Sequence, residues 1–108
     1  MTTINKVAVI GSGVMGSGIA HWLSSRSYPV VLQDISEPQI ASGMRSIAKL
    51  FDSAVKRKTM TDLEAKQARD LIHPSASPVP LDDVDLVIEA ATEDLGIKLE
   101  NVTLEDLG

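Results

Sequence analysis

The chain has 108 residues, of which 44% are hydrophobic and 23% charged, and its formal net charge is −5 at pH 7. This length and composition fit one soluble globular domain, and the acidic balance argues against nucleic acid as a partner. No stretch approaches the roughly 20 apolar residues of a membrane span. Because cysteine is absent we expect no disulfide and no thiolate metal site, and the composition is compatible with the cytoplasmic location that we expect. No metal ligand is assigned.

An apolar run and three glycines open the chain. Lys6 to Ile10 has the pattern of a buried strand, and Gly11-x-Gly13-x-x-Gly16 follows it directly before a helical pattern. Such a turn directs free backbone N–H groups, and the positive end of the helix dipole, at one point. This context predicts a dinucleotide site, with a glycine turn that binds nothing as the alternative. The cofactor contacts expected in the turn are Gly11, Ser12, Gly13, Val14, Met15 and Gly16.

The first helix is expected from about Val14 to Ser25, and a second buried strand at Val30 to Gln33. Gly16 and Gly18 would let this helix lie close on the strands. Helical spacing predicts that four of its side chains face the sheet, namely Met15, Ile19, Trp22 and Leu23.

Two capping boxes mark the starts of later helices. Ser36-x-x-Gln39 begins a helix of about 20 residues, which would span on the order of 30 Å. That helix ends in the basic run Lys56-Arg57-Lys58, where cations also complement the helix dipole. Thr61-x-x-Glu64 begins a shorter helix that ends at about Leu71.

Two more strands and a closing helix complete the predicted elements. We expect strands at Ile72 to Ser75 and Asp85 to Glu89, and a helix from Asp94 to Leu107. Strands that alternate with helices through right-handed crossovers predict an α/β fold, a Rossmann-type doubly wound parallel sheet in the order 3-2-1-4. The sheet is expected to be incomplete. The edge of the strand Asp85 to Glu89 would then be exposed and apolar, which predicts self-association into a homo-oligomer through that edge or through its covering helix.

Asp34 lies 18 residues beyond Gly16, at the carboxyl end of the second strand. An acid at this position can accept hydrogen bonds from both hydroxyls of an adenosine ribose, and its charge would repel a 2′-phosphate. No arginine follows within residues 34–36 to neutralise such a phosphate, so NAD is favoured over NADP. A solvated acid at the end of a strand, or a helix cap, is the alternative.

Three segments resemble the NAD-binding domain of the L-3-hydroxyacyl-CoA dehydrogenases. They are residues Gly11 to Ala20, residues Val30 to Asp34, and residues Asp85 to Ala90 with the following Glu93 and Lys98. The resemblance extends over nearly the whole chain and is weak from about Lys58 to Leu81. It implies a parent oxidoreductase that transfers hydride between a 3-hydroxyacyl-CoA and NAD in fatty-acid or related acyl-CoA metabolism.

The resemblance also implies roles for residues outside the glycine turn. Ala90, Glu93 and Lys98 would lie at the nicotinamide side of the cofactor, although Glu93 could instead complement a helix dipole and Lys98 could be solvated. The long second helix borders coenzyme A in the family. Lys56, Arg57 and Lys58 would therefore be candidates to contact its phosphates, with a solvated helix end as the alternative.

The two histidines limit what these residues are expected to catalyse. The family uses a histidine general base within a His-Phe-x-Asn-Pro motif, and nothing of the kind occurs here. His21 and His73 are interpreted as structural, so no catalytic residue is assigned. We expect residues 1–108 to be an NAD-binding domain, truncated before the catalytic histidine segment and a C-terminal helical domain, that binds cofactor without turning over substrate. A non-catalytic NAD-binding module, and a dehydrogenase of the same superfamily for another 3-hydroxy acid, are the alternatives.

Overall fold

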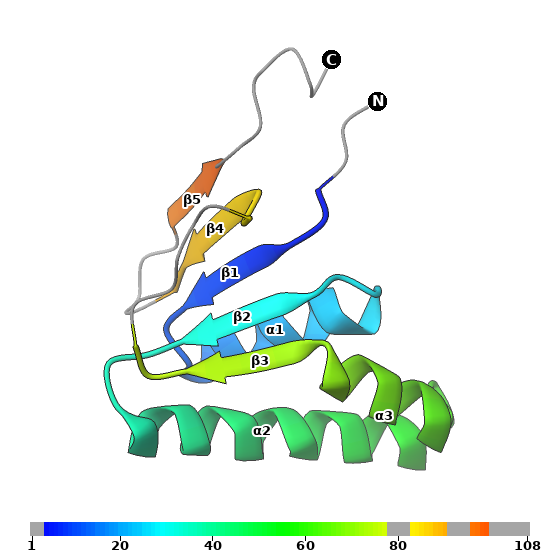
Figure 1. Ribbon diagram of the computed structural model, residues 1–108. Helices are drawn as coiled ribbons and strands as arrows, with labels where there is room; N and C mark the ends of the chain where they lie inside the picture. The colour runs from blue at the N-terminus through cyan, green and yellow to red at the C-terminus, as the bar shows by residue number, and fades with distance from the viewer. Residues whose placement is uncertain (1–3, 78–82, 91–95, 100–108) are drawn as a thin grey trace.

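The computed structural model describes residues 4–77, 83–90 and 96–99. Residues 97–99 are described by their backbone alone. Five strands and three helices follow one another along these residues (Figure 1). In chain order they are β1 Val7–Ile10, α1 Val14–Ser25, β2 Val30–Gln33, α2 Glu37–Lys56, α3 Asp62–Asp70, β3 Ile72–Ser75, β4 Leu86–Glu89 and β5 Gly96–Leu99.

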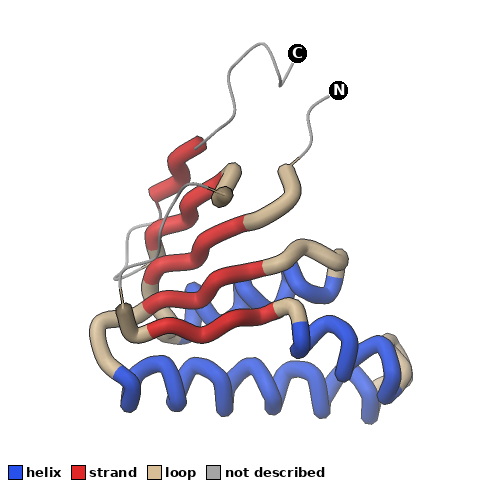
Figure 2. The backbone as a smooth tube through the Cα atoms, viewed as in Figure 1, coloured by secondary structure: helices blue, strands red, loops and turns tan. Residues whose placement is uncertain are grey.

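The strands form one sheet in the order β3-β2-β1-β4-β5, and the first four are parallel. Figure 2 shows these strands side by side. β1 is central: Val7 pairs with Val30 on one side and with Leu86 on the other. The predicted order 3-2-1-4 is therefore confirmed. The carboxyl ends of the four strands meet at one edge of the sheet, and both the glycine turn and Asp34 follow directly from that edge.

The predicted closing helix is wrong at Gly96–Leu99, which forms β5 and pairs antiparallel with β4. The rest of that prediction lies outside the described residues. Two local features favour a strand: Ile97 and Leu99 alternate with Gly96 and Lys98, and glycine is a poor helix former. β5 covers the edge of β4 from which self-association was predicted. The homo-oligomer stays a prediction, but the exposed edge of β4 no longer supports it.

The main core lies between one face of the sheet and the helices. Strand residues of alternate position point into it, and Ile47 and Phe51 of α2 are almost fully buried there. Burying a side chain of this size contributes about 1.5–3 kcal/mol, so these two residues anchor α2 against the sheet. Buried members of this cluster include Val7, Val9, Val30, Leu32, Ile72 and Ile88 from the strands. The opposite face carries a smaller cluster of Ala8, Val84 and Val87.

The packing of helix α1 corrects two predictions, one for Trp22 and one for Gly18. The side chains of α1 that are buried are small, apart from Leu23, and the ring of His21 packs edge-on against Phe51 at 4.5 Å. Trp22 instead lies on the outer face, 54% exposed, with the guanidinium of Arg26 4.4 Å from its ring centre. It does not face the sheet, because it lies beside the buried stripe of α1 that Gly16, Ala20 and Leu23 form at helical spacing. Gly18 was also assigned wrongly, since a Cβ atom there would meet nothing within 4 Å.

One of the two capping boxes is confirmed. The N–H of Glu64 donates to Thr61 Oγ1 at 3.1 Å, and the N–H of Thr61 donates to Glu64 Oε1 at 2.9 Å. Ser36 does cap α2 by position, but its side chain makes no capping hydrogen bond, so the Ser36–Gln39 box is wrong.

No helix in the described part of the chain is long and apolar enough to cross a membrane.

Candidate cofactor site

The glycine turn between β1 and α1 requires glycine at two of its positions. Gly11 has φ 106°, in the region that L side chains rarely adopt, and its N–H donates to the carbonyl of Gln33 at 2.7 Å. A Cβ atom at Gly16 would overlap the carbonyl oxygen of Gly11. Gly16 therefore allows the helix to begin directly against the turn. Both glycines serve the tight change of direction from strand to helix.

Gly13 serves a different purpose from the other two glycines. A Cβ atom there would meet nothing within 4 Å, so the space in front of the turn is open. Gly13 is the N-cap of α1, and the N–H groups of Gly13, Val14 and Met15 have no hydrogen-bond partner among the described residues. The first turn of α1 carries no acidic side chain. Free donors and the helix dipole thus face open space, which suits a pyrophosphate.

The carboxylate of Asp34 is held against the same turn. Its Oδ2 accepts from the N–H and the hydroxyl of Ser12, at 2.8 and 2.6 Å, and its Oδ1 accepts from the N–H of Ile35 at 2.7 Å. Partial burial raises the pKa of Asp34, but these hydrogen bonds outweigh it, so the pKa lies below the ordinary value. Asp34 is therefore ionised at neutral pH, as an acceptor of hydroxyl groups has to be.

A cleft of about 390 Å³ lies between the glycine turn and the start of α2. None of the described residues that line it is basic, so the cleft offers no partner to a 2′-phosphate. Sequence reasoning missed half of the lining, the residues Ile35, Gln39 and Ser42. Their signal was present in part: Ile35 follows Asp34 directly, and Gln39 and Ser42 share one face of α2 at helical spacing. The lining comprises Ser12, Gly13, Asp34, Ile35, Gln39 and Ser42.

Of the three residues predicted at the nicotinamide side, Ala90, Glu93 and Lys98, only Ala90 is found directly at the carboxyl edge of the sheet in the described part of the chain. Ala90 is buried just beyond β4, and its N–H donates to the carbonyl of Ile10 at 2.7 Å, so it lies beside the start of the glycine turn. Glu93 lies outside the described residues. Lys98 belongs to β5, where its backbone pairs with Val87. That position is two residues back from the carboxyl edge of β4, or about 7 Å along the strand.

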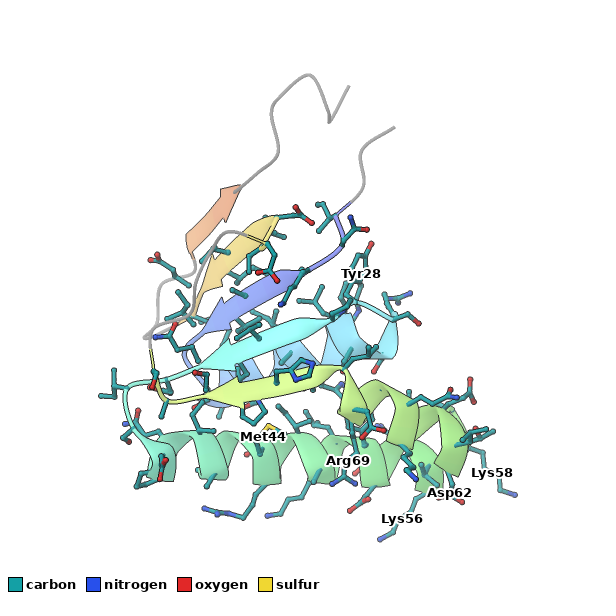
Figure 3. The ribbon with its side chains drawn as sticks, viewed as in Figure 1. Tyr28, Met44, Lys56, Lys58, Asp62 and Arg69 are labelled. Carbon is teal, nitrogen blue, oxygen red and sulfur yellow. The ribbon has the colours of Figure 1, made fainter. Side chains whose placement is uncertain are left out.

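The basic run Lys56-Arg57-Lys58 is not brought to the cleft. Gly43, in the first half of α2, contacts Ser12 of the glycine turn, whereas Lys56 is the last residue of the same helix. Thirteen residues of helix separate the two, a distance of about 20 Å. Figure 3 shows Lys56 and Lys58 at the end of α2 that lies away from the carboxyl ends of the strands.

Asp34 should make the free energy of unfolding depend on pH. A carboxyl whose pKa is lower in the folded chain stabilises the fold fully above its unfolded pKa of about 3.9. This contribution is lost as the pH falls through the folded-state pKa. We expect the free energy of unfolding of the wild type, relative to Asp34→Asn, to be largest at neutral pH and to shrink in acid. Denaturant titrations of both proteins over a pH series measure it, and a difference independent of pH would contradict the role given to these hydrogen bonds.

The parallel sheet, the glycine turn with its free N–H groups and the acid at the end of β2 together define a dinucleotide-binding domain of the Rossmann type. The chain belongs more narrowly to the 3-hydroxyacyl-CoA dehydrogenase family, as its NAD-binding domain, because the profile of that family matches residues 6–105. NAD is the cofactor of this family of domains.

Individual relatives agree with this assignment. The fatty acid oxidation complex subunit alpha of Acinetobacter baumannii is 38% identical over 95 residues, which cover 88% of this chain and 13% of that protein. The (S)-3-hydroxybutyryl-CoA dehydrogenase of Ralstonia eutropha is 35% identical with a TM-score of 0.80, over 85% of this chain and 32% of that one. The 3-hydroxybutyryl-CoA dehydrogenase of Escherichia coli K12 is 36% identical with a TM-score of 0.78, over 85% and 20%. The chain therefore spans only a small part of the length of its relatives.

Proposed function

We propose that this chain holds NAD for an enzyme that transfers hydride between a 3-hydroxyacyl-CoA and NAD. The observation that carries the proposal is the placing of two complementary groups across one cleft. Free N–H groups at the start of α1 suit a pyrophosphate, and the ionised Asp34 suits ribose hydroxyls. Bound NAD would supply the hydride chemistry, while the residues described here bind and orient it.

The hydrogen bonds of Asp34 leave room for the ribose. An ionised carboxylate offers about four acceptor positions, and three of them are used by Ser12 and Ile35. The remaining position accepts one ribose hydroxyl. A second position becomes free when the Ser12 hydroxyl turns to its alternative acceptor, the carbonyl oxygen of Gln39 at 3.0 Å. Both hydroxyls of an unphosphorylated ribose are thereby accommodated.

The proposed substrate is a 3-hydroxyacyl-CoA. Two solved relatives are named 3-hydroxybutyryl-CoA dehydrogenases, which supports an acyl-CoA substrate. The bond from the Ala90 N–H to the Ile10 carbonyl, beside the glycine turn, supports the proposal that Ala90 adjoins the nicotinamide half of the cofactor. Glu93 and Lys98 stay proposed nicotinamide-side residues on the resemblance alone. Lys56, Arg57 and Lys58 stay proposed contacts of coenzyme A, in a region about 20 Å along α2 from the glycine turn.

Neither histidine of this chain is placed to act as the general base, so we propose that residues outside 1–108 supply it. The Nε2 atom of His21 is buried without a partner among the described residues, and its ring packs on Phe51 between α1 and α2. Burial lowers the pKa of His21. His73 lies within β3, at the edge of the sheet. Neither follows the carboxyl end of β1, β2 or β4. Residues 1–108 alone would therefore bind NAD without turnover, as a non-catalytic NAD-binding module also would.

The absence of cysteine supports a cytoplasmic location.

Titration of the 108-residue chain with NAD and with NADP tests the proposal. We expect weak but saturable binding of NAD and at least about tenfold weaker binding of NADP, because Asp34 repels the 2′-phosphate. Calorimetry, or amide shifts of residues 11–16 in NMR spectra, measures both affinities. Equal affinity for the two dinucleotides would remove Asp34 from the ribose site, and absence of binding to either would contradict the proposed function.

A further inference from the structure

Ser17 makes a hydrogen bond that the other serines of α1 do not. Its side chain is 1% exposed, and its hydroxyl donates to the carbonyl oxygen of Ser12 at 2.8 Å. Serine within a helix ordinarily donates to a carbonyl three or four residues earlier. Ser24 and Ser25 follow that pattern, both donating to the carbonyl of His21. Ser17 instead reaches five residues back, out of the helix and into the glycine turn.

This bond fixes a peptide plane of the turn. In a planar trans peptide the C=O and the N–H point in opposite directions, and no peptide of the described chain is cis. Holding the Ser12 carbonyl toward Ser17 therefore turns the N–H of Gly13 away from the helix and toward the open side. The preceding peptide is held too, because the N–H of Ser12 donates to Asp34. Both peptide planes beside Ser12 are thus set before any ligand arrives.

Helix α2 closes the remaining side of this arrangement. A Cβ atom at Gly43 would lie 2.7 Å from both Cβ and the carbonyl oxygen of Ser12, so α2 abuts the turn with no room for a side chain. The carbonyl oxygen of Gly43 is a second acceptor for the Ser17 hydroxyl at 3.4 Å. A hydroxyl has one proton, and the shorter bond to Ser12 holds it.

We infer that Ser17 is a positioning residue of the pyrophosphate site, which presets the Gly13 N–H without touching the ligand. The inference rests on the proposed binding of NAD. Without the hydroxyl, the buried carbonyl of Ser12 loses its partner and the flexible Gly13 peptide can rotate. Binding a phosphate then has to order the Gly13 peptide, and this lowers the affinity. Ligands without a phosphate do not need that peptide ordered, so their affinity is not lowered.

Ser17→Ala separates this role from a general effect on the fold. We expect the affinity for ADP to fall about three- to tenfold, the amount expected for one neutral hydrogen bond, while the weak affinity for adenosine changes less than about twofold. Ser24→Ala is the matched control, because Ser24 is also 1% exposed and bonds a backbone carbonyl, but at the other end of α1. It should change neither affinity. NMR titrations of the wild type and both variants with ADP and with adenosine, followed at the Gly13 amide, measure all six affinities.

Two outcomes overturn the role of Ser17: unchanged ADP affinity in Ser17→Ala, or an equal loss for ADP and adenosine. Ser17→Cys keeps the volume and a weak donor, so it provides the measurement if the alanine variant does not fold. It should lie between wild type and Ser17→Ala for ADP, and wild-type ADP affinity would again overturn the inference. If the wild-type chain binds neither ligand, the proposed function itself fails, and the role of Ser17 fails with it.

Discussion

Gly16→Ala is expected to remove most NAD binding and to destabilise the fold. The added Cβ atom would overlap the carbonyl oxygen of Gly11, which is backbone and cannot swing aside as a flexible side chain would. Either α1 or the glycine turn has to move, and both carry the donors of the pyrophosphate site. Overpacking of this kind costs about 1–3 kcal/mol. We expect the melting temperature to fall by about 5–20 °C and the NAD affinity to fall at least about tenfold, measured by thermal unfolding and calorimetry.

Gly18→Ala is the matched control two residues further along the same helix. A Cβ atom there meets nothing within 4 Å, and replacing glycine by alanine inside a helix gains about 1 kcal/mol. This variant should melt a few degrees higher than the wild type and bind NAD unchanged. If Gly16→Ala behaved like Gly18→Ala, the close approach between α1 and the turn would not be needed for binding.

Most of the fold could be predicted because its signals are local. The apolar runs before Gly11 and Asp34 and the Thr61–Glu64 capping box each belong to a single element. The order 3-2-1-4 then follows from right-handed crossovers. β5 could not be predicted in the same way. Its alternating pattern covers only the four residues Gly96–Leu99, and the partner that stabilises it as a strand is the edge of β4, which lies outside that segment.

The site was predictable where a residue acts through its own backbone or charge. Gly11, Gly13, Gly16 and Asp34 were identified from their spacing. In the structure Gly13 and Asp34 line one cleft, and Gly11 and Gly16 form the tight turn beside it. The orientation of α1 was not predictable from the spacing of its large apolar residues, because the buried stripe is formed mostly by small residues and leaves Trp22 outside. The bond from Ser17 to Ser12 joins a helix to a turn, and no sequence pattern indicates it.

Asp34→Ala should lower the affinity for NAD about ten- to hundredfold and reduce the discrimination against NADP. Hydrogen bonds to a charged group contribute about 1.5–3 kcal/mol each, and the ribose would lose its acceptor. The repulsion of a 2′-phosphate would be lost at the same time, so the affinities for NAD and NADP should approach each other. Parallel titrations of wild type and variant with both dinucleotides measure the two effects.

Two further variants separate the charge of Asp34 from its part in holding the turn. Asp34→Asn keeps an oxygen that can accept from the N–H of Ser12, so it should retain more NAD affinity than Asp34→Ala while losing the discrimination against NADP. Asp52→Ala removes an exposed acid of α2 that does not line the cleft, and it should change neither affinity. If Asp34→Asn still rejected NADP as strongly as the wild type, the selection for NAD would arise from the shape of the cleft and not from the charge of Asp34.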